Sequence, residues 1–148
     1  MREQHEDRLT AAASREQRYE RGLEAMRRFD GHAGERIIEI LEDISPELGH
    51  QIVAWAFGDM YFRPALPPRD RQLMTLSMLT ALGGAETELE LHINVSLAVG
   101  LTPEEIVEAF LHTAVYCGMP RALSATLVAK KVLGARGMLP VNSSSDQP

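Results

Sequence analysis

Residues 88–122, ELELHINVSLAVGLTPEEIVEAFLHTAVYCGMPRA, decide the fold of this chain of 148 residues. The second part of this stretch begins with Thr102-Pro103, a strong helix-start pattern, and predicts a helix that ends near Cys117. The first part, residues 88–97, alternates polar and apolar side chains, and this pattern alone also fits a half-buried strand. We predict a helix there instead, because no other segment could pair with a lone strand and its backbone groups would stay unsatisfied.

The N-terminal half of the chain also shows helical patterns. Ser14 and Gln17 have the spacing of a capping box at the start of a first helix. Ser45-Pro46 marks the start of another helix at residues 47–61. The apolar spacing in that helix predicts four inward-facing residues, Leu48, Ile52, Trp55 and Ala56.

The middle of the chain combines a stiff connection with an unusually apolar helix. Residues 63–68, RPALPP, are expected to be extended, because each proline fixes its own φ and disfavours helix in the residue before it. Asp70 can then cap residues 71–82, RQLMTLSMLTAL, which are apolar nearly all round. A single chain of this length has difficulty burying such a helix, so we expect a homo-oligomer. A last helix should begin at Pro120, and with no strand predicted the fold class is all-α.

Composition points to one globular domain between two short tails. The chain is 45% hydrophobic, which is enough for one compact core, and it is too short to expect two. Residues 1–13 are polar without apolar periodicity, and residues 141–148, VNSSSDQP, are polar and Ser-rich. We therefore expect disordered tails at 1–13 and 141–148 around a helical domain at 14–140.

Charge and cysteine content argue against several partners and locations. A net charge of −6 and a pI near 5.4 disfavour nucleic acid, because proteins that bind it usually carry a basic patch. One cysteine cannot form an intramolecular disulfide, and the N-terminus has no apolar run that could serve as a signal peptide or membrane span. We expect a cytoplasmic protein that binds neither nucleic acid nor membranes.

A narrow polar stripe within residues 88–97 is the first candidate for chemistry. At about 100° per residue, Glu88, His92 and Ser96 lie in line on one helix face, with apolar residues on both sides. A buried catalytic helix would show such a stripe. The spacing fits equally well an exposed pair of Glu88 and His92 that only adds a little helix stability.

Cys117, the single thiol, allows two interpretations. It shares a helical face with Ile106, Phe110 and Thr113, which favours a small buried hydrophobe over a reactive thiol. The sequence contains no CxxC, HExxH, GxGxxG, Walker or GxSxG motif. Its five histidines are scattered without metal-ligand spacing, so we expect no metal site.

Two long runs of the sequence resemble a known family. Residues 58–82, GDMYFRPALPPRDRQLMTLSMLTAL, and residues 88–120, which include HINVSLAVGLTPEEI and AVYCGMP, resemble the carboxymuconolactone decarboxylase family, relatives of the alkylhydroperoxidase D fold. RYERGLEAMRRF at residues 18–29 is similar to that family's opening helix. The resemblance spans residues 19–133 and implies an all-helical, alkylhydroperoxidase D-like bundle that assembles into trimers or hexamers.

The histidine indicates one branch of that family. The peroxidase branch carries a CxxC pair followed by a histidine, and with that histidine laid on His92 the cysteines would fall at Ala85 and Glu88. Neither residue is a cysteine, so dithiol chemistry has no nucleophile here. The decarboxylase-like branch keeps the histidine. The resemblance therefore implies the cofactor-free decarboxylation of a γ-carboxymuconolactone-like small acid, as in aromatic catabolism of the β-ketoadipate type.

The stripe and the resemblance together suggest the residues of the site. His92 is expected to donate and accept the proton, and Glu88 to orient it or to carry a second proton. Arg63 or Arg71 would anchor the substrate carboxylate. Three further pocket residues are expected: Ser96, Tyr116 and Cys117.

Three other functions stay open. The chain could catalyse a different proton transfer on the same fold, as a cyclase or an isomerase. A thiol peroxidase is disfavoured by the missing CxxC pair. A non-catalytic helical oligomer would be indicated by an apolar filling around His92.

Overall fold

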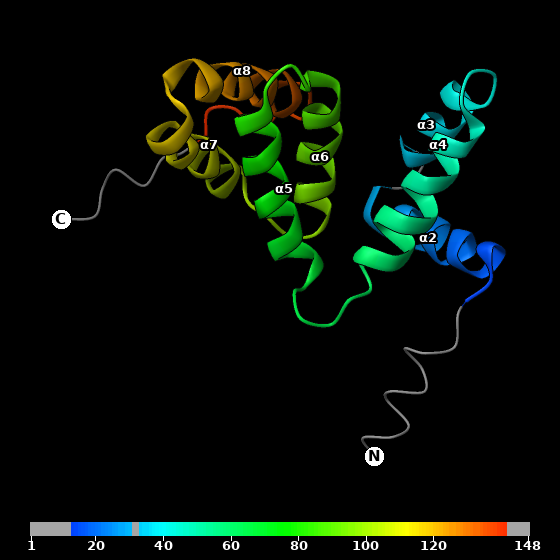
Figure 1. Cartoon of the computed structure of the whole chain (residues 1–148). Helices are drawn as coiled ribbons and strands as arrows, with labels where there is room; N and C mark the ends of the chain where they lie inside the picture. The colour runs from blue at the N-terminus through cyan, green and yellow to red at the C-terminus, as the bar shows by residue number, and fades with distance from the viewer. Residues whose placement is uncertain (1–12, 31–32, 142–148) are drawn as a thin grey trace. The chain divides into compact units, whose positions relative to one another are not determined.

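The structure of the chain, a computed structural model, consists of helices joined by short turns (Figure 1). It describes residues 13–30 and 33–141. No strand occurs in these ranges, which confirms the all-α fold class. Within the same ranges, no helix is long and apolar enough to cross a membrane. The predicted tails, 1–13 and 141–148, lie almost wholly outside the described residues and stay predictions.

The helices belong to two compact units, divided between Pro64 and Ala65. The first unit contains α2 (Arg15–Asp30), α3 (Ala33–Leu41), α4 (Pro46–Gln51) and the π-helix η1 (Ile52–Met60). The predicted capping box opens α2: the Ser14 N–H donates to Gln17 Oε1 at 2.9 Å, and the Gln17 N–H donates to Ser14 Oγ at 3.1 Å. The buried residues at the centre of this unit are Ala25, Met26, Val53 and Phe57.

Two glycines allow α2 and η1 to cross with their backbones in contact. A Cβ atom at Gly22 would overlap the carbonyl oxygen of Val53, and a Cβ atom at Gly58 would overlap that of Arg18. Beside the crossing, Arg18 Nε donates to Asp59 Oδ2 at 2.8 Å. The close crossing therefore requires glycine at both positions, and the ion pair between Arg18 and Asp59 joins the two helices beside it.

The prediction for residues 47–61 was partly correct: the second part differs in helix type, and of the four residues predicted to face inward, Ile52 and Ala56 pack against the core. Leu48 and Trp55 are 51% and 58% exposed, whereas Val53 and Phe57 are buried. The second part of this segment is a π-helix, in which each N–H bonds to the carbonyl five residues earlier. Its wider turn means that residues spaced for an α-helix no longer share one face.

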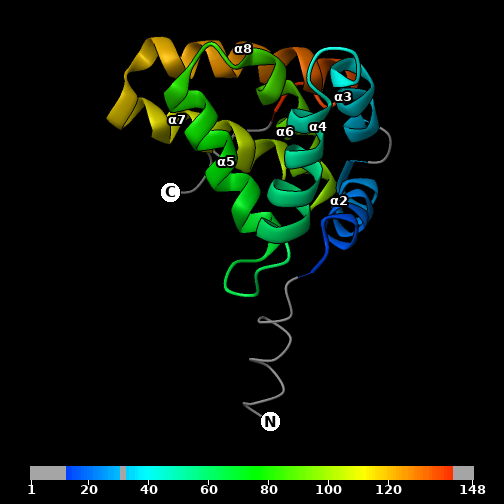
Figure 2. The ribbon, with the colours of Figure 1, turned by 45° about the vertical axis from the view of Figure 1, so that its right-hand side comes forward.

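The second unit contains α5 (Pro68–Leu82), α6 (Glu86–Ala98), α7 (Pro103–Cys117) and α8 (Met119–Ala135). α5 packs along α6, and α7 packs along α8, as seen in Figure 1 and in the turned view of Figure 2. α7 begins at the predicted helix start, where a capping box forms: the Glu105 N–H donates to Thr102 Oγ1 at 3.2 Å. The core of the unit is formed by Leu76, Leu89, Ile93, Leu101, Ile106, Phe110, Ala125, Ala129, Val132 and Leu133.

Residues 88–97 are helical, as predicted, and lie within α6. The side of α6 opposite the polar stripe is bound to α8. Lys131 Nζ donates to Glu90 Oε2 at 2.7 Å, and Arg136 Nε donates to Asn94 Oδ1 at 2.8 Å. The stripe therefore faces away from the side of α6 that carries these two contacts.

α5 starts earlier than predicted and buries one face. Pro67 is the N-cap residue and Pro68 the first helical residue, so Asp70 lies in the first turn and does not cap the helix. The buried residues follow one stripe, Gln72, Leu76 and Thr80. Met74, Met78 and Leu82 are exposed. Burial on several sides, which the apolar sequence suggested, is not reached within a single chain.

Candidate active site

His92 lies at the centre of the candidate site, on the side of α6 that faces α5. Its imidazole is half-buried, and its Nδ1 atom lies 3.0 Å from Oε1 of Gln72 on α5. Gln72 is fully buried. A hydrogen bond between two neighbouring helices therefore determines the orientation of the ring.

The surroundings of His92 favour its neutral form. Burial lowers the pKa of His92 from 6.5 to about 4, because the charged imidazolium loses hydration, and the negative charge of Glu88 opposes this shift in part. Glu88 lies one turn earlier on α6, and its side chain is exposed. At neutral pH, His92 is an uncharged ring with one nitrogen bearing a proton and the other a lone pair.

Ser96 continues the predicted stripe into the interior. It is fully buried, and its Oγ donates to the backbone carbonyl of His92 at 2.6 Å. The stripe thus runs from the exposed Glu88, through the half-buried His92, to the buried Ser96. Because the Ser96 hydroxyl already donates its proton within α6, it can act toward other groups only as a hydrogen-bond acceptor.

Gln72 is a residue of the candidate site that the sequence analysis missed. It sits in the segment that was described as apolar nearly all round, four residues before Leu76 and eight before Thr80 on the same buried stripe. A polar side chain at a core position needs a hydrogen-bond partner, and that requirement was the available signal. Which residue would be the partner depends on the packing of α5 against α6, which no pattern within α5 specifies.

The two arginines proposed as carboxylate anchors belong to different units. Arg71 lies in the first turn of α5 and is half-buried, and its Nε donates to the carbonyl oxygen of Leu66 at 3.1 Å. Arg63 follows η1 in the first unit and is exposed. The neighbouring Arg69 forms an ion pair with Glu105 of α7. Arg71 is therefore the anchor candidate in the unit that contains His92.

Tyr116 and Cys117 lie at the end of α7, and both are exposed. The expectation that Cys117 would be buried with Ile106, Phe110 and Thr113 was wrong for the single chain. The helical spacing was correct, but Cys117 is the last residue of α7, and the chain turns away at Gly118, which has φ 88°. The final turn of a helix can extend beyond the helices that cover its earlier turns.

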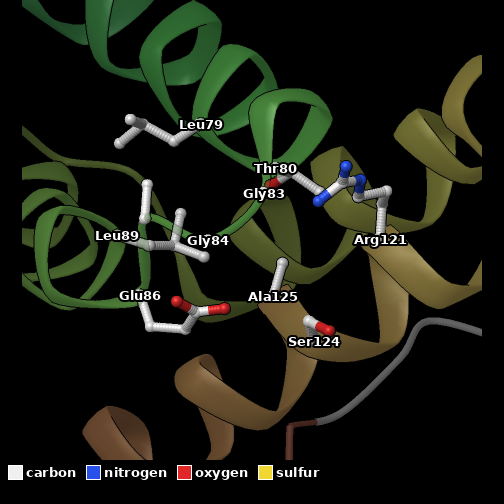
Figure 3. A pocket seen from close by; sticks show the side chains of 10 residues that line it. Leu79, Thr80, Gly83, Gly84, Glu86, Leu89, Arg121, Ser124 and Ala125 are labelled. Carbon is white, nitrogen blue, oxygen red and sulfur yellow. The ribbon is translucent and has the colours of Figure 1, made fainter.

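A small cavity lies at the turn between α5 and α6 (Figure 3). Its volume is about 50 Å³, far below the roughly 300 Å³ at which small-molecule sites usually begin. Arg121 reaches toward Gly83 from α8, and Glu86 and Ser124 line the other sides. His92 is not among its lining residues, so this cavity is not the expected substrate pocket. Among the described residues, no three His, Cys, Asp or Glu side chains are grouped so that they could hold a metal ion.

Comparisons with known proteins point to one family. The profile of the carboxymuconolactone decarboxylase family matches residues 46–131. A 4-carboxymuconolactone decarboxylase of Acinetobacter baylyi is 34% identical over 132 residues, which is 88% of this chain and 98% of the relative. The nitrosuccinic acid decarboxylase npaB of Metarhizium robertsii is 40% identical over 82 residues, 55% of this chain and 57% of the relative. An uncharacterized 15.0 kDa protein of Paracoccus denitrificans is 26% identical over 118 residues, 79% of this chain and 88% of the relative.

The matched segment includes every helix that builds the candidate site. Residues 46–131 contain α5 and α6, and with them Gln72 and His92. The two relatives with a named activity are both decarboxylases, which confirms the expected class of enzyme, a carboxy-lyase. The family profile and the nearly full-length match to the Acinetobacter enzyme show that the chain belongs to the carboxymuconolactone decarboxylase family.

Proposed function

We propose that the chain decarboxylates a small acid related to γ-carboxymuconolactone without a cofactor, and that His92 moves the proton. The observation that carries this proposal is the half-buried imidazole of His92, bound to Gln72, in a chain that belongs to a decarboxylase family. The substrate class is supported by the Acinetobacter relative, whose name states that it acts on 4-carboxymuconolactone. The reaction would belong to aromatic catabolism of the β-ketoadipate type.

The proposed reaction needs little from the protein besides positioning and one proton. The bond between the ring carbon and the carboxylate breaks, CO2 leaves, and the electron pair enters the unsaturated lactone as a dienolate. A proton is then delivered to the α carbon. The protein must hold the carboxylates, stabilise the enolate oxygen and supply that proton at the correct carbon. An imidazole fixed between two helices meets the last requirement.

The other proposed roles follow from where each residue lies. Glu88, at the exposed edge of the stripe, would exchange protons with solvent and favour the charged imidazole. Arg71 would anchor a substrate carboxylate, with Arg63 as a second candidate. The remaining proposed pocket residues are Ser96, Tyr116 and Cys117.

We further propose that the chain is an alkylhydroperoxidase D-like bundle that functions as a homo-oligomer, a trimer or a hexamer. Two sets of exposed apolar side chains in the second unit support an assembly. Met74, Met78 and Leu82 form a stripe on α5, and α7 and α8 expose Leu111, Val115, Tyr116, Met119, Leu123 and Leu127. Large exposed apolar patches on a soluble protein often mark an interaction surface.

A second function, isomerisation or cyclisation through proton transfer, is favoured by one observation. A neutral imidazole with a lone pair is suited to removing a proton from an activated carbon, which such reactions require. Thiol peroxidase activity is the least supported alternative, because positions 85 and 88 are Ala and Glu.

Product analysis distinguishes these functions. The purified chain is incubated separately with γ-carboxymuconolactone and with nitrosuccinic acid, without added metal or nucleotide, and both substrate loss and CO2 release are followed. We expect one CO2 for each γ-carboxymuconolactone consumed. Turnover of nitrosuccinic acid alone would replace the proposed substrate class, and conversion of the lactone without CO2 release would favour the isomerase.

A further inference from the structure

We propose that Gln72 is a positioning residue that holds the neutral His92 with its proton on Nδ1, so that Nε2 is the atom that exchanges a proton with the substrate. The first part of this inference concerns the free protein alone. The second part rests on the proposed function, because it assumes that His92 acts on a bound acid. Nothing in the comparisons assigns a role to Gln72.

The hydrogen bond itself determines the tautomer. The atom of Gln72 that faces the ring is Oε1, which can only accept, and it lies 3.0 Å from Nδ1 of His92. Nδ1 must therefore be the donor and carry the proton. In the neutral ring the remaining lone pair is then on Nε2. When Nε2 is protonated, the Nδ1–H donor stays in place, so the bond to Gln72 persists through both states.

Burial keeps this arrangement in one form. Gln72 is fully buried on the face of α5 that also buries Leu76 and Thr80. On the other side, α6 is held against α8 by Lys131 and Arg136. A rotation of the ring would turn a C–H group toward Oε1 of the buried Gln72 and break the hydrogen bond between them, which is strongly disfavoured.

The electrostatics of His92 explain why an amide in this position matters. On its own helix, Glu88 acts on the ring from an exposed position. On the other helices of the unit, Glu105 of α7 is paired with Arg69, and Lys131 of α8 is bound to Glu90. Arg136, just after the end of α8, is bound to Asn94. An amide oxygen orients the ring without adding charge, whereas a carboxylate in its place would also stabilise the imidazolium.

With Nδ1 bound to Gln72, the proton movements of the proposed reaction follow one order. Nε2 first takes a proton from a solvent acid while the anionic substrate is bound, giving the imidazolium. The carbon–carboxylate bond then breaks, CO2 leaves, and its electron pair forms the dienolate. The Nε2 proton passes to the α carbon, and His92 returns to the neutral Nδ1–H form. Each turnover consumes one substrate carboxylate and one solvent proton and yields one CO2.

Nitrogen NMR on the full-length protein tests the inference without any substrate. Protein labelled with 15N-histidine is examined by magic-angle-spinning NMR, and the signal of His92 is assigned by its loss in His92→Gln. We expect wild type above pH 7 to show protonated Nδ1 and unprotonated Nε2. Gln72→Leu should populate both tautomers, and Gln72→Glu should raise the pKa of His92 by one unit or more. An Nε2–H tautomer in wild type, or a wild-type ring signal in Gln72→Leu, would overturn the proposal.

A matched variant and a kinetic measurement complete the test. Thr80→Val alters another buried polar residue on the same stripe of α5, two turns from Gln72, and it should leave the His92 signals unchanged. If Gln72→Leu does not fold, the wild-type tautomer and the Gln72→Glu titration still decide the question.

With γ-carboxymuconolactone as substrate, Gln72→Glu should shift the pH profile of kcat/KM to higher pH by the same amount as the NMR titration midpoint of His92. An unshifted profile would mean that Gln72 has no role in turnover. A wild type with the expected tautomer but no CO2 release would refute the proposed function and leave the positioning role in the free protein standing.

Discussion

Acidification should destabilise this protein through His92 in a defined pH window. The pKa of His92 is about 4 in the folded protein, against an ordinary value of 6.5. Between these values the unfolded chain binds a proton on this ring and the folded chain does not, so folding stability decreases as the pH falls from about 6.5 to about 4. Above that window the contribution of the neutral, buried ring is fully present.

The size of the effect follows from the shift. Each pKa unit corresponds to about 1.4 kcal/mol, so the whole window is worth on the order of 3 kcal/mol. Between pH 7 and pH 5, a range in which the carboxylates of the chain titrate little, the loss from His92 should be about 2 kcal/mol.

Urea unfolding at fixed protein concentration measures this loss. Wild type and His92→Gln are compared at pH 7 and pH 5, and wild type should lose about 2 kcal/mol more than the variant. The loss of the hydrogen bond between Gln72 and His92 in the variant contributes equally at both pH values and cancels. His112→Gln, which removes an exposed ring from α7, serves as the control and should behave as wild type. Equal losses in wild type and His92→Gln would refute the claim that folding keeps His92 neutral.

Three further predictions follow from the packing of the chain. Gly22→Ala and Gly58→Ala should each lower the free energy of unfolding by about 1–3 kcal/mol, because the added Cβ would meet a backbone carbonyl of the crossing helix. As a control, Gly49→Ala, whose added Cβ would have its nearest neighbour 3.7 Å away, should change the free energy of unfolding by less than about 0.5 kcal/mol or raise it. Equal effects at all three positions in urea unfolding would contradict the close crossing of α2 and η1. Light scattering at micromolar concentration should give the mass of a trimer or a hexamer, and a mass of 16.4 kDa would rule out the proposed assembly. Because Cys117 is exposed, Cys117→Ser should change stability by less than about 0.5 kcal/mol in thermal unfolding, and a loss of several kcal/mol would mean that the thiol is packed after all.

The sequence predicted most helices because their ends are encoded locally. The capping box at Ser14 and the helix start at Thr102 are found as expected, and each needs only residues three positions apart. The decision for helix over strand at residues 88–97 was also correct, because it used the absence of a pairing partner rather than the pattern alone. Helix ends that depend on local hydrogen bonds, and the need of every backbone group for a hydrogen-bond partner, can therefore be used to predict structure from a single sequence.

The features that the sequence did not reveal depend on contacts between helices. The π-helix places Val53 and Phe57 in the core, whereas α-helical spacing predicted Trp55 there. Val53 lies at the crossing of η1 with α2, where the backbones are in contact at Gly22 and Gly58. Gln72 was hidden in an apolar segment, because its partner lies 20 residues away on another helix. The stripe containing His92 was visible from spacing, whereas the residue that orients its ring was not.

In the proposed function, His92 moves the proton in a decarboxylation. The most direct test compares the rate of CO2 release from γ-carboxymuconolactone by wild type and by His92→Gln, without added metal or nucleotide, with circular dichroism as the check on folding. Because a positioned acid–base group contributes on the order of 10²–10⁴-fold, the variant should be slower by a factor in that range. A folded His92→Gln that releases CO2 at the wild-type rate would mean that His92 does not move the proton.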